Sequence, residues 1–377
     1  MAKVIYGPRA EVKRLVIKIG SSSLNHPNGG ICHVSLAMFV AEIARLREQG
    51  IQVIIVSSGA VAAGMGILGL RNRPKTVSEK QATAAVGQGY LIQRYNEELS
   101  RYGLIGAQVL LTRADLGLRE RYCNARNTLE SLLRNEVVPI VNENDTVAVE
   151  ELCFGDNDKL SALVAGIVDA QLLAIFSDID GLYTANPRQN PEAELITRVM
   201  KVTPEIEGLA AGKGSEIGTG GMLSKLSAAK MVTNFGIGML ILNGGKPEEL
   251  SKFLFGGQVG TYFEPRKGRL PSRKRWMGWG GISEGTIQVD EGAKSAIINE
   301  GKSLLPKGVV KIEGNWEKGN LVRIVDAKHE EIARGVVSLS SVELERCKGL
   351  HSEEAAVVVG REKACEVIHR DFLTVVK

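Results

Sequence analysis

The stretch IQVIIVSSGAVAAG, residues 51–64, joins a short apolar run to Ser58 and Gly59, where a helix is expected to open. Comparable runs, partly β-branched and mostly ended by Gly, Ser, Thr, Asn or Asp, recur as RLVIKIG (14–20), LIGAQVLLT (104–112), VVPIVNEND (137–145), QLLAIFSD (171–178) and IGMLILNGG (237–245). Short, continuous apolar runs bounded by turn residues are typical of buried parallel strands. The stretch therefore predicts one strand of a buried, mainly parallel sheet.

Longer amphipathic segments separate these runs. The clearest are VSLAMFVAEIARLREQG (34–50), VSEKQATAAVGQGYLIQRYNEELSRYG (77–103) and DKLSALVAGIVD (158–169). Alternation of strands and helices is typical of a doubly wound α/β sheet covered by helices on both faces. We predict such a domain over residues 10–263.

The pattern of predicted elements changes after residue 280. Short strand-like runs follow one another as GTIQVD (285–290), GVVKIEG (308–314), NLVRIVDA (320–327), EIARGVVSL (331–339) and AAVVVG (355–360). Only DEGAKSAIINEG (290–301) and SVELERCKG (341–349) have a helical pattern. We predict a small, mostly β domain over residues 281–373.

Composition is that of a globular chain of about two domains. The 377 residues are 44% hydrophobic and 24% charged. No apolar run is long enough for a membrane span, and MAKVIYGPRA lacks the core of a signal peptide, so a cytoplasmic location is expected. Five scattered cysteines without a CxxC pair are expected to be reduced core thiols, and no metal site with protein ligands is predicted.

Charge is concentrated in one place. The formal net charge is +4, and residues 264–280 alone hold six Arg/Lys against one Glu. We predict that this segment is a basic linker, and that the rest of the chain offers no general surface for polyanions.

Polar residues follow several predicted strands, at the sheet edge where open α/β folds bind ligands. Lys18 ends the first strand, where it either meets an anion or reaches to solvent. Ser58 either binds an anion or caps a helix. Ser177 and Asp178 either bind a nucleotide or form a turn. Between the fourth strand and the next helix lie Asn142, Asn144, Asp145, Asp156, Asn157 and Asp158, more polar side chains than turns require.

The segment GTGGMLSKLSAAK, residues 218–230, is spaced differently from a P-loop. Met222, Leu226 and Ala229 nevertheless indicate a helix that begins at the glycines. The free amides at the start of this helix and Lys225 in its first turn could bind a phosphate. The alternative is that the glycines form only a turn that caps an ordinary helix. Two lysines and an amide nest, without a Ser/His/Asp arrangement, favour phosphoryl transfer.

Ten motifs together resemble one family. They are KIGSS, VIIVSSGAVAAG, AAVGQ, LLTRAD, NARNTL, VPIVNENDTVA, GDNDKLSALVA, GLYTANPR, GTGGMLSKLSAA and SRKRW. The chain is similar along nearly its whole length to the glutamate 5-kinases, amino-acid kinases that carry a C-terminal PUA domain. The resemblance implies an amino-acid-kinase-type sheet sandwiched by helices over residues 10–263, a basic linker over 264–280 and a PUA domain over 281–373.

The resemblance also implies a reaction and a role for each site residue. ATP would phosphorylate L-glutamate, with Mg²⁺ held by phosphate oxygens. Lys18 and Lys225 would stabilise the transferred phosphate, and Asp158 would hold both lysines. Glutamate would bind to Ser58, Asp145 and Asn157. ATP would bind to Lys18, Ser177, Asp178, Thr219, Gly220, Gly221, Met222, Leu223, Ser224 and Lys225. Many members have Thr at the position of Ser177, and both residues supply a hydroxyl.

Two other functions stay open. One is another amino-acid kinase, acting on aspartate, N-acetylglutamate or a nucleoside monophosphate, although the PUA-like tail argues against aspartate kinase. The other is RNA binding by the tail and the basic linker. Stacking on bases has weak support, because the tail has few aromatic residues that look exposed beyond Trp276, Trp279 and Trp316. From the resemblance we also expect a homo-oligomer, a dimer or tetramer, with proline as feedback inhibitor and no membrane partner.

Overall fold

The chain forms two compact units in the computed structural model, which describes residues 12–26, 30–148, 157–210, 221–266, 268, 275, 277–278, 281–360 and 365–376. The larger unit contains residues 1–116 and 120–269, and the smaller contains residues 117–119 and 270–377. Each unit has a separate hydrophobic core.

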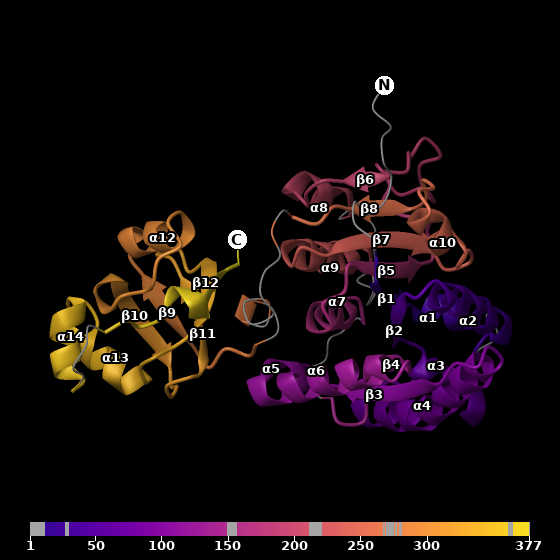
Figure 1. The fold of residues 1–377 in the computed structure, drawn as a ribbon, viewed down its shortest axis with the longest axis horizontal. Coiled ribbons are helices and arrows are strands. Elements are labelled where there is room, and N and C mark those ends of the chain that lie inside the picture. The colour runs from indigo at the N-terminus through magenta and orange to yellow at the C-terminus, as the bar shows by residue number, and fades with distance from the viewer. Residues whose placement is uncertain are drawn as a thin grey trace. The chain divides into compact units, whose positions relative to one another are not determined.

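Within the described residues, the larger unit has an eight-stranded sheet in the order β3-β4-β2-β1-β5-β7-β8-β6 (Figure 1). Neighbouring strands are parallel except for the pair β7 and β8. The strands are β1 (Arg14–Ile19), β2 (Gln52–Ser57), β3 (Gly106–Leu111), β4 (Val138–Glu143), β5 (Leu172–Ser177), β6 (Arg198–Val199), β7 (Gly238–Asn243) and β8 (Thr261–Phe263). The predicted mainly parallel α/β sheet is confirmed, and each of its six predicted strands forms.

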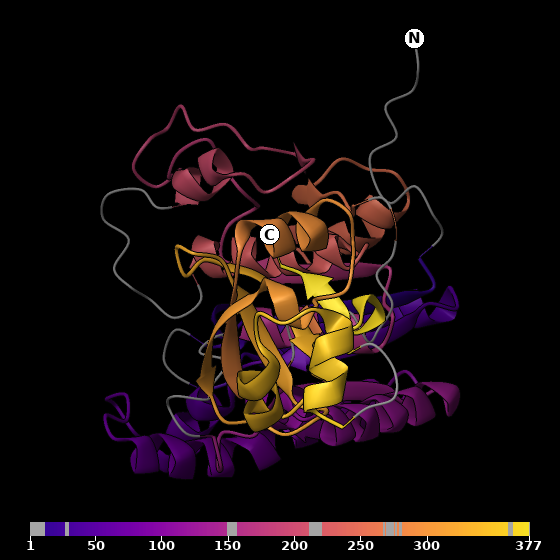
Figure 2. The ribbon, with the colours of Figure 1, turned by 90° about the vertical axis from the view of Figure 1, so that its left-hand side faces the viewer.

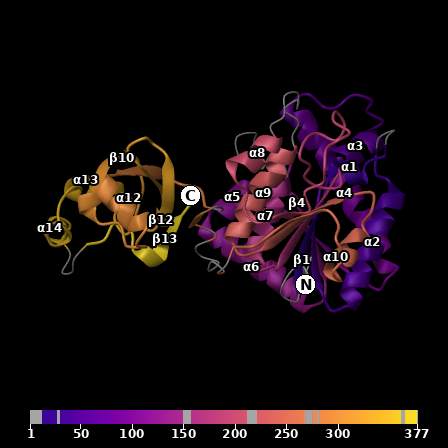
Figure 3. The ribbon, with the colours of Figure 1, turned by 90° about the horizontal axis from the view of Figure 1, so that it is seen from above.

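Helices cover both faces of this sheet (Figure 3). They are α1 (Ser21–Leu24), α2 (His33–Glu48), α3 (Ala60–Leu68), α4 (Val77–Ser100), α5 (Arg113–Gly117), α6 (Arg119–Arg134), α7 (Asn157–Ile167), α8 (Pro204–Ala210), α9 (Met222–Asn234) and α10 (Glu249–Leu254). Leu15, Ile17 and Ile19 of β1 pack in one core with α2, α4 and α10. Because side chains alternate along a strand, Val16 and Lys18 point to the opposite face, where α7 and α9 lie.

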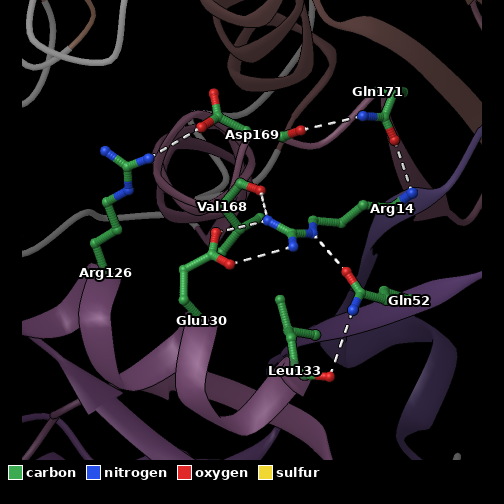
Figure 4. Close-up of polar contacts among 8 residues, drawn as sticks. All are labelled: Arg14, Gln52, Arg126, Glu130, Leu133, Val168, Asp169 and Gln171. Atoms are coloured by element: carbon green, nitrogen blue, oxygen red, sulfur yellow. Dashed lines mark hydrogen bonds and ion pairs between the residues drawn. The ribbon is translucent and has the colours of Figure 1, made fainter. Parts of the chain in front are cut away.

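Arg14 forms hydrogen bonds with several elements at the amino end of the sheet (Figure 4). Its guanidinium donates to both carboxylate oxygens of Glu130 on α6, at 2.7 and 3.2 Å, and to the carbonyl of Val168. Its Nε donates to Gln52 of β2 at 2.9 Å, and its backbone amide donates to Gln171 at 2.7 Å. These bonds satisfy polar groups around the start of β1, so the edge opposite the predicted site is held by structural contacts.

The smaller unit contains a five-stranded sheet in the order β10-β9-β11-β12-β13 within the residues described, drawn in orange and yellow in Figure 2. Its elements are β9 (Gly285–Val289), α12 (Glu291–Ile298), η3 (Pro306–Gly308), β10 (Val309–Gly314), β11 (Leu321–Val325), β12 (Glu331–Val336), α13 (Ser341–Cys347), α14 (Ser352–Val358), η4 (Arg370–Phe372) and β13 (Leu373–Val375). The predicted second domain with a sheet is confirmed, although helices cover about as many of its described residues as strands do.

Two predictions about the smaller unit are wrong. The run AAVVVG belongs largely to helix α14, which opens with a capping box between His351 and Glu354 and buries Ala355 and Ala356. Trp316 is buried and donates to the carbonyl of Leu339, so it offers no exposed face for stacking; Trp276 and Trp279 lie outside the described residues.

The cysteines differ in their surroundings. Cys347 and Cys365 are buried thiols as predicted, Cys32 is half-buried, and Cys123 is exposed and outside the core. Cys153 lies outside the described residues. Among the helices that the structure describes, none is both long and apolar enough to cross a membrane.

Candidate active site

The predicted site residues that the structure describes gather at the carboxyl edge of the large sheet. They follow or end β1, β2, β4 and β5, or lie in the first turns of α7 and α9: Lys18, Ser58, Asp145, Asn157, Asp158, Ser177, Asp178, Gly221, Met222, Leu223, Ser224 and Lys225. Thr219 and Gly220 lie outside the described residues.

Asp158 lies between two lysine side chains. Its Oδ1 is 2.5 Å from Nζ of Lys18, and its Oδ2 is 3.3 Å from Nζ of Lys225. The exposed fractions are 0% for Asp158, 4% for Lys18 and 5% for Lys225. Two ammonium groups thus lie on one carboxylate at the carboxyl edge of the sheet. Positive charges held in place in this way can stabilise an anionic ligand.

The helix starts of α7 and α9 position Asp158 and Lys225. Asp158 is in the first turn of α7, where the helix dipole favours a negative charge. Gly221 is the N-cap of α9, so Lys225 falls at the start of that helix, and the predicted helix beginning at the glycines is confirmed. Ser161 also donates to the backbone carbonyl of Asp158 at 2.7 Å, which anchors the turn that carries the carboxylate.

Ser58 and Asn157 meet beside this cluster. Nδ2 of Asn157 donates to Oγ of Ser58 at 3.0 Å and to the carbonyl of Ser57 at 2.7 Å. The alternative of Ser58 as a helix cap is excluded, because the N-cap of α3 is Gly59. Gly59 has a φ of 106°, a left-handed conformation in which glycine is favoured. The hydroxyl of Ser58 is thereby directed to Asn157.

A cavity of about 910 Å³ opens next to these two residues. Ser58, Asn142, Asp145 and Asn157 all line it, together with the first residues of α3. Burial raises the pKa of Asp145 above the ordinary range of an aspartate. A cation that bound there would restore the charged form, so this wall of the cavity suits an ammonium group.

A second set of polar residues lies at the end of β5. Oγ of Ser177 donates to Oδ1 of Asp178 at 3.2 Å, and Arg188 donates to Oδ2 of Asp178 at 2.7 Å. Ser177 lies opposite Asn243 in the register of β5 and β7. Both alternatives drawn from the sequence, a turn and a nucleotide site, remain compatible with this geometry.

Sequence reasoning missed the polar residues of β7 and its loop. Asn243 donates to Oδ1 of Asp180 at 3.0 Å, and Nζ of Lys246 lies 3.5 Å from the same oxygen. The bond from Asn243 is the main cause that holds the pKa of Asp180 below its ordinary value. A signal was present, because the run IGMLILNGG ends at this same edge in Asn and two glycines.

Metal ligands do not cluster in the part of the chain that the structure describes: it contains no group of three or more His, Cys, Asp or Glu side chains placed to hold an ion. A magnesium ion does not require such a cage when substrate phosphates supply most of its ligands.

Two family models match the chain. One, described as the amino acid kinase family, matches residues 13–243, and the other, described as the PUA domain, matches residues 285–359. The glutamate 5-kinase of Desulfitobacterium hafniense (strain Y51) is 52% identical over 366 residues, 97% of this chain and 99% of that protein. The glutamate 5-kinase of Moorella thermoacetica is 49% identical over 366 residues, 97% of each chain.

A solved structure shares the fold of the larger unit. The carbamate kinase from Giardia lamblia bound to AMP-PNP aligns with a TM-score of 0.50 at 15% identity, over 68% of this chain and 99% of that one. At this identity the likeness concerns the fold alone. The relatives with about half of their residues identical span nearly the whole chain, and the first family model covers most of the larger unit, so the chain belongs to the amino acid kinase family and, within it, to the glutamate 5-kinases.

Proposed function

We propose that the chain transfers the γ-phosphate of ATP to the γ-carboxylate of L-glutamate, which yields L-glutamyl 5-phosphate and ADP in the first step of proline biosynthesis. The observation that carries this proposal is the buried carboxylate of Asp158 between Lys18 and Lys225, beside a polar cavity. Membership of the glutamate 5-kinases supports the choice of substrate.

The lysines address the main difficulty of this reaction. A glutamate carboxylate oxygen forms the new bond to phosphorus while the bond to the ADP oxygen breaks, and both reactants are anions. The nucleophile is already ionised at neutral pH, so no proton has to be removed from it. Lys18 and Lys225 offset the repulsion and stabilise the negative charge on the phosphoryl oxygens, and Asp158 keeps both ammonium groups in place.

Glutamate occupies the cavity in this proposal. Asp145 and Asn157 receive its α-ammonium group, and Ser58 contacts the same amino acid. ATP lies across the ends of β5 and β7 and the start of α9, where Ser177, Asp178 and the segment from Thr219 to Lys225 bind it. Phosphate oxygens of the nucleotide would supply most ligands of a Mg²⁺ ion, which would neutralise part of their charge.

Hydroxamate formation tests the proposal. Full-length protein is incubated with ATP, Mg²⁺, hydroxylamine and one of L-glutamate, L-aspartate or N-acetylglutamate. We expect γ-glutamyl hydroxamate from L-glutamate, with far lower turnover of the other two, because N-acetylglutamate lacks the free ammonium group that Asp145 and Asn157 are proposed to bind, and the side chain of aspartate is shorter. Equal or better turnover of N-acetylglutamate would contradict the proposal.

We also propose the domain bounds, the cellular location, the assembly and the regulation of the protein. Residues 10–263 form the kinase domain, 264–280 the basic linker and 281–373 the PUA domain. The protein works in the cytoplasm as a dimer or tetramer, with proline as feedback inhibitor. RNA binding by the PUA domain is a weaker alternative, since Trp316 is buried. A salt-sensitive RNA gel shift at micromolar protein or below would support it.

A further inference from the structure

A glutamine of helix α4 is hydrogen-bonded to a residue that lines the cavity. Oε1 of Gln88 accepts a hydrogen bond from Nδ2 of Asn142 at 2.8 Å. Asn142 is buried and lines the cavity. Its Oδ1 accepts in turn from Nδ2 of Asn157 at 2.9 Å. A continuous chain of side-chain amides thus joins α4 to the residue proposed to bind glutamate.

Backbone groups define which end of each amide is which. The N–H of Glu143 donates to Oδ1 of Asn142 at 2.9 Å, so this atom is the carbonyl oxygen. The carbonyl of Ser57 accepts from Nδ2 of Asn157 at 2.7 Å, so that atom is the amide nitrogen. Because a primary amide has one acceptor and one donor end, the orientation of both asparagines follows from these contacts.

The orientation decides what Asn157 presents to a ligand. Its nitrogen is engaged by Ser57, Ser58 and Asn142, which leaves the carbonyl oxygen as the end available to the cavity. An oxygen acceptor suits an ammonium group, and Asp145 lines the same cavity. If Asn142 turned over, its nitrogen would face the nitrogen of Asn157, and two donors would oppose each other.

We propose that Gln88 is a positioning residue for the amino-acid substrate: by accepting from Asn142, it reinforces the amide orientation set by the backbone of Glu143 and Ser57, and so helps to hold the carbonyl oxygen of Asn157 toward the substrate's α-ammonium group. The inference rests on the proposed function for the identity of that substrate. Packing places Gln88 in reach of Asn142, since the neighbouring Gly87 lies against the backbone of Ala60 at the start of α3.

Kinetics of three full-length variants test this role. Gln88→Leu keeps the volume but removes the acceptor, and we expect the KM for glutamate to rise about tenfold, while kcat and the KM for ATP stay within about twofold. Gln88→Glu retains an acceptor at the same place and is expected to keep the KM of the unchanged protein. The matched control is Gln81→Leu, on the same helix, whose side chain donates to the carbonyl of Ala148 at 3.1 Å outside the amide chain.

Two kinetic results would overturn the proposal. One is an unchanged glutamate KM in Gln88→Leu. The other is an equal rise in Gln81→Leu, since any loosened contact between α4 and the loop after β4 would then suffice. A general loss of folding in Gln88→Leu would appear as a lowered Tm and a change in every kinetic constant, and Gln88→Glu then decides: a tenfold rise in its KM contradicts the proposal, and a normal KM supports it.

Nuclear magnetic resonance separates this inference from the proposed function. In protein labelled with ¹⁵N-asparagine and free of ligands, Gln88→Leu is expected to shift the side-chain NH₂ signals of Asn142 and Asn157, whereas Gln81→Leu leaves them in place. Unmoved Asn157 signals would overturn the positioning role, whichever substrate the enzyme uses. Failure of the proposed function would instead appear as absent hydroxamate formation in the unchanged protein.

Discussion

Lys225 shares the carboxylate of Asp158 with Lys18, and its ammonium group is almost fully buried. Because it stabilises charge in the transition state, we expect Lys225→Ala to lower kcat by about a hundredfold or more, with a smaller change in ATP binding. Lys230→Ala is the control, since Lys230 is exposed on the same helix and pairs with Glu207 at 3.2 Å. A normal kcat with only a raised KM for ATP would assign Lys225 to ground-state binding.

Asp145 should make substrate binding sensitive to acid. Burial raises the pKa of Asp145, so its carboxylate takes up a proton at a higher pH than an ordinary aspartate does. The KM for glutamate is expected to rise as the pH falls through that pKa, because the protonated acid no longer attracts the α-ammonium group. Asp145→Asn should have a high KM at every pH and lose this dependence. A persistent acidic rise in KM in that variant would point to another group.

The same shift has a consequence for stability. A carboxyl group with a raised pKa in the folded state favours folding when it is protonated and opposes folding when it is ionised. Asp145→Asn is therefore expected to raise the Tm at neutral pH while it weakens glutamate binding, and the advantage should shrink as the pH falls through the pKa. Thermal denaturation across a pH series provides the measurement.

At the scale of elements, helices α3 and α4 cross with their backbones in contact. A Cβ on Gly87 would lie 1.9 Å from the carbonyl oxygen of Ala60 and 2.3 Å from the nitrogen of Gly64. Both neighbours are backbone atoms, so Gly87→Ala forces the helices apart and is expected to destabilise the fold by about 1–3 kcal/mol or more.

Gly89 supplies the control on the same helix. A Cβ there would meet nothing within 4 Å. Gly89→Ala is expected to stabilise the fold by about 0.5–1 kcal/mol, because alanine has the higher helix propensity. Urea denaturation of both variants is the measurement. Equal stability of the two would show that the close contact between α3 and α4 is relaxed in solution.

At the scale of the whole molecule, the two units have separate cores. The larger core includes residues of β1, β2, β4, β5, β7 and β8 with helices α2, α4 and α10, and the smaller core begins at Ile287. Every described residue assigned to the reaction lies in the larger unit. A chain that ends after Arg269 is therefore expected to fold and to keep its kcat/KM for glutamate within about tenfold.

The truncated protein is compared with the full chain by kcat/KM and circular dichroism. A loss of several orders of magnitude in a truncated protein that remains well folded would show that the smaller unit completes the active site. Aggregation would show instead that the cut exposes apolar surface. Changes in assembly or in inhibition by proline are compatible with the division of labour proposed here.

The sequence by itself determined the elements and the edge at which function lies. Apolar runs such as residues 14–19 and 238–243 are strands because a sheet buried on both faces requires continuous hydrophobicity. Helix α9 begins at Met222, directly after its N-cap Gly221, as the apolar spacing after the glycines predicts. Local pattern failed at residues 355–360, where valines typical of a strand form a helix, since capping and burial of Ala355 and Ala356 outweigh β propensity.

Tertiary structure alone decided which polar groups meet. Lys18, Asp158 and Lys225 lie far apart in the chain, and their convergence depends on the pairing of β1 with its neighbours and on the packing of α7 and α9. No sequence pattern links Gln88 to Asn142, because that contact depends on how closely α4 approaches α3 at Gly87. Periodicity records which face of an element is apolar, whereas the orientation of an amide is set by partners that only the folded chain brings within hydrogen-bonding distance.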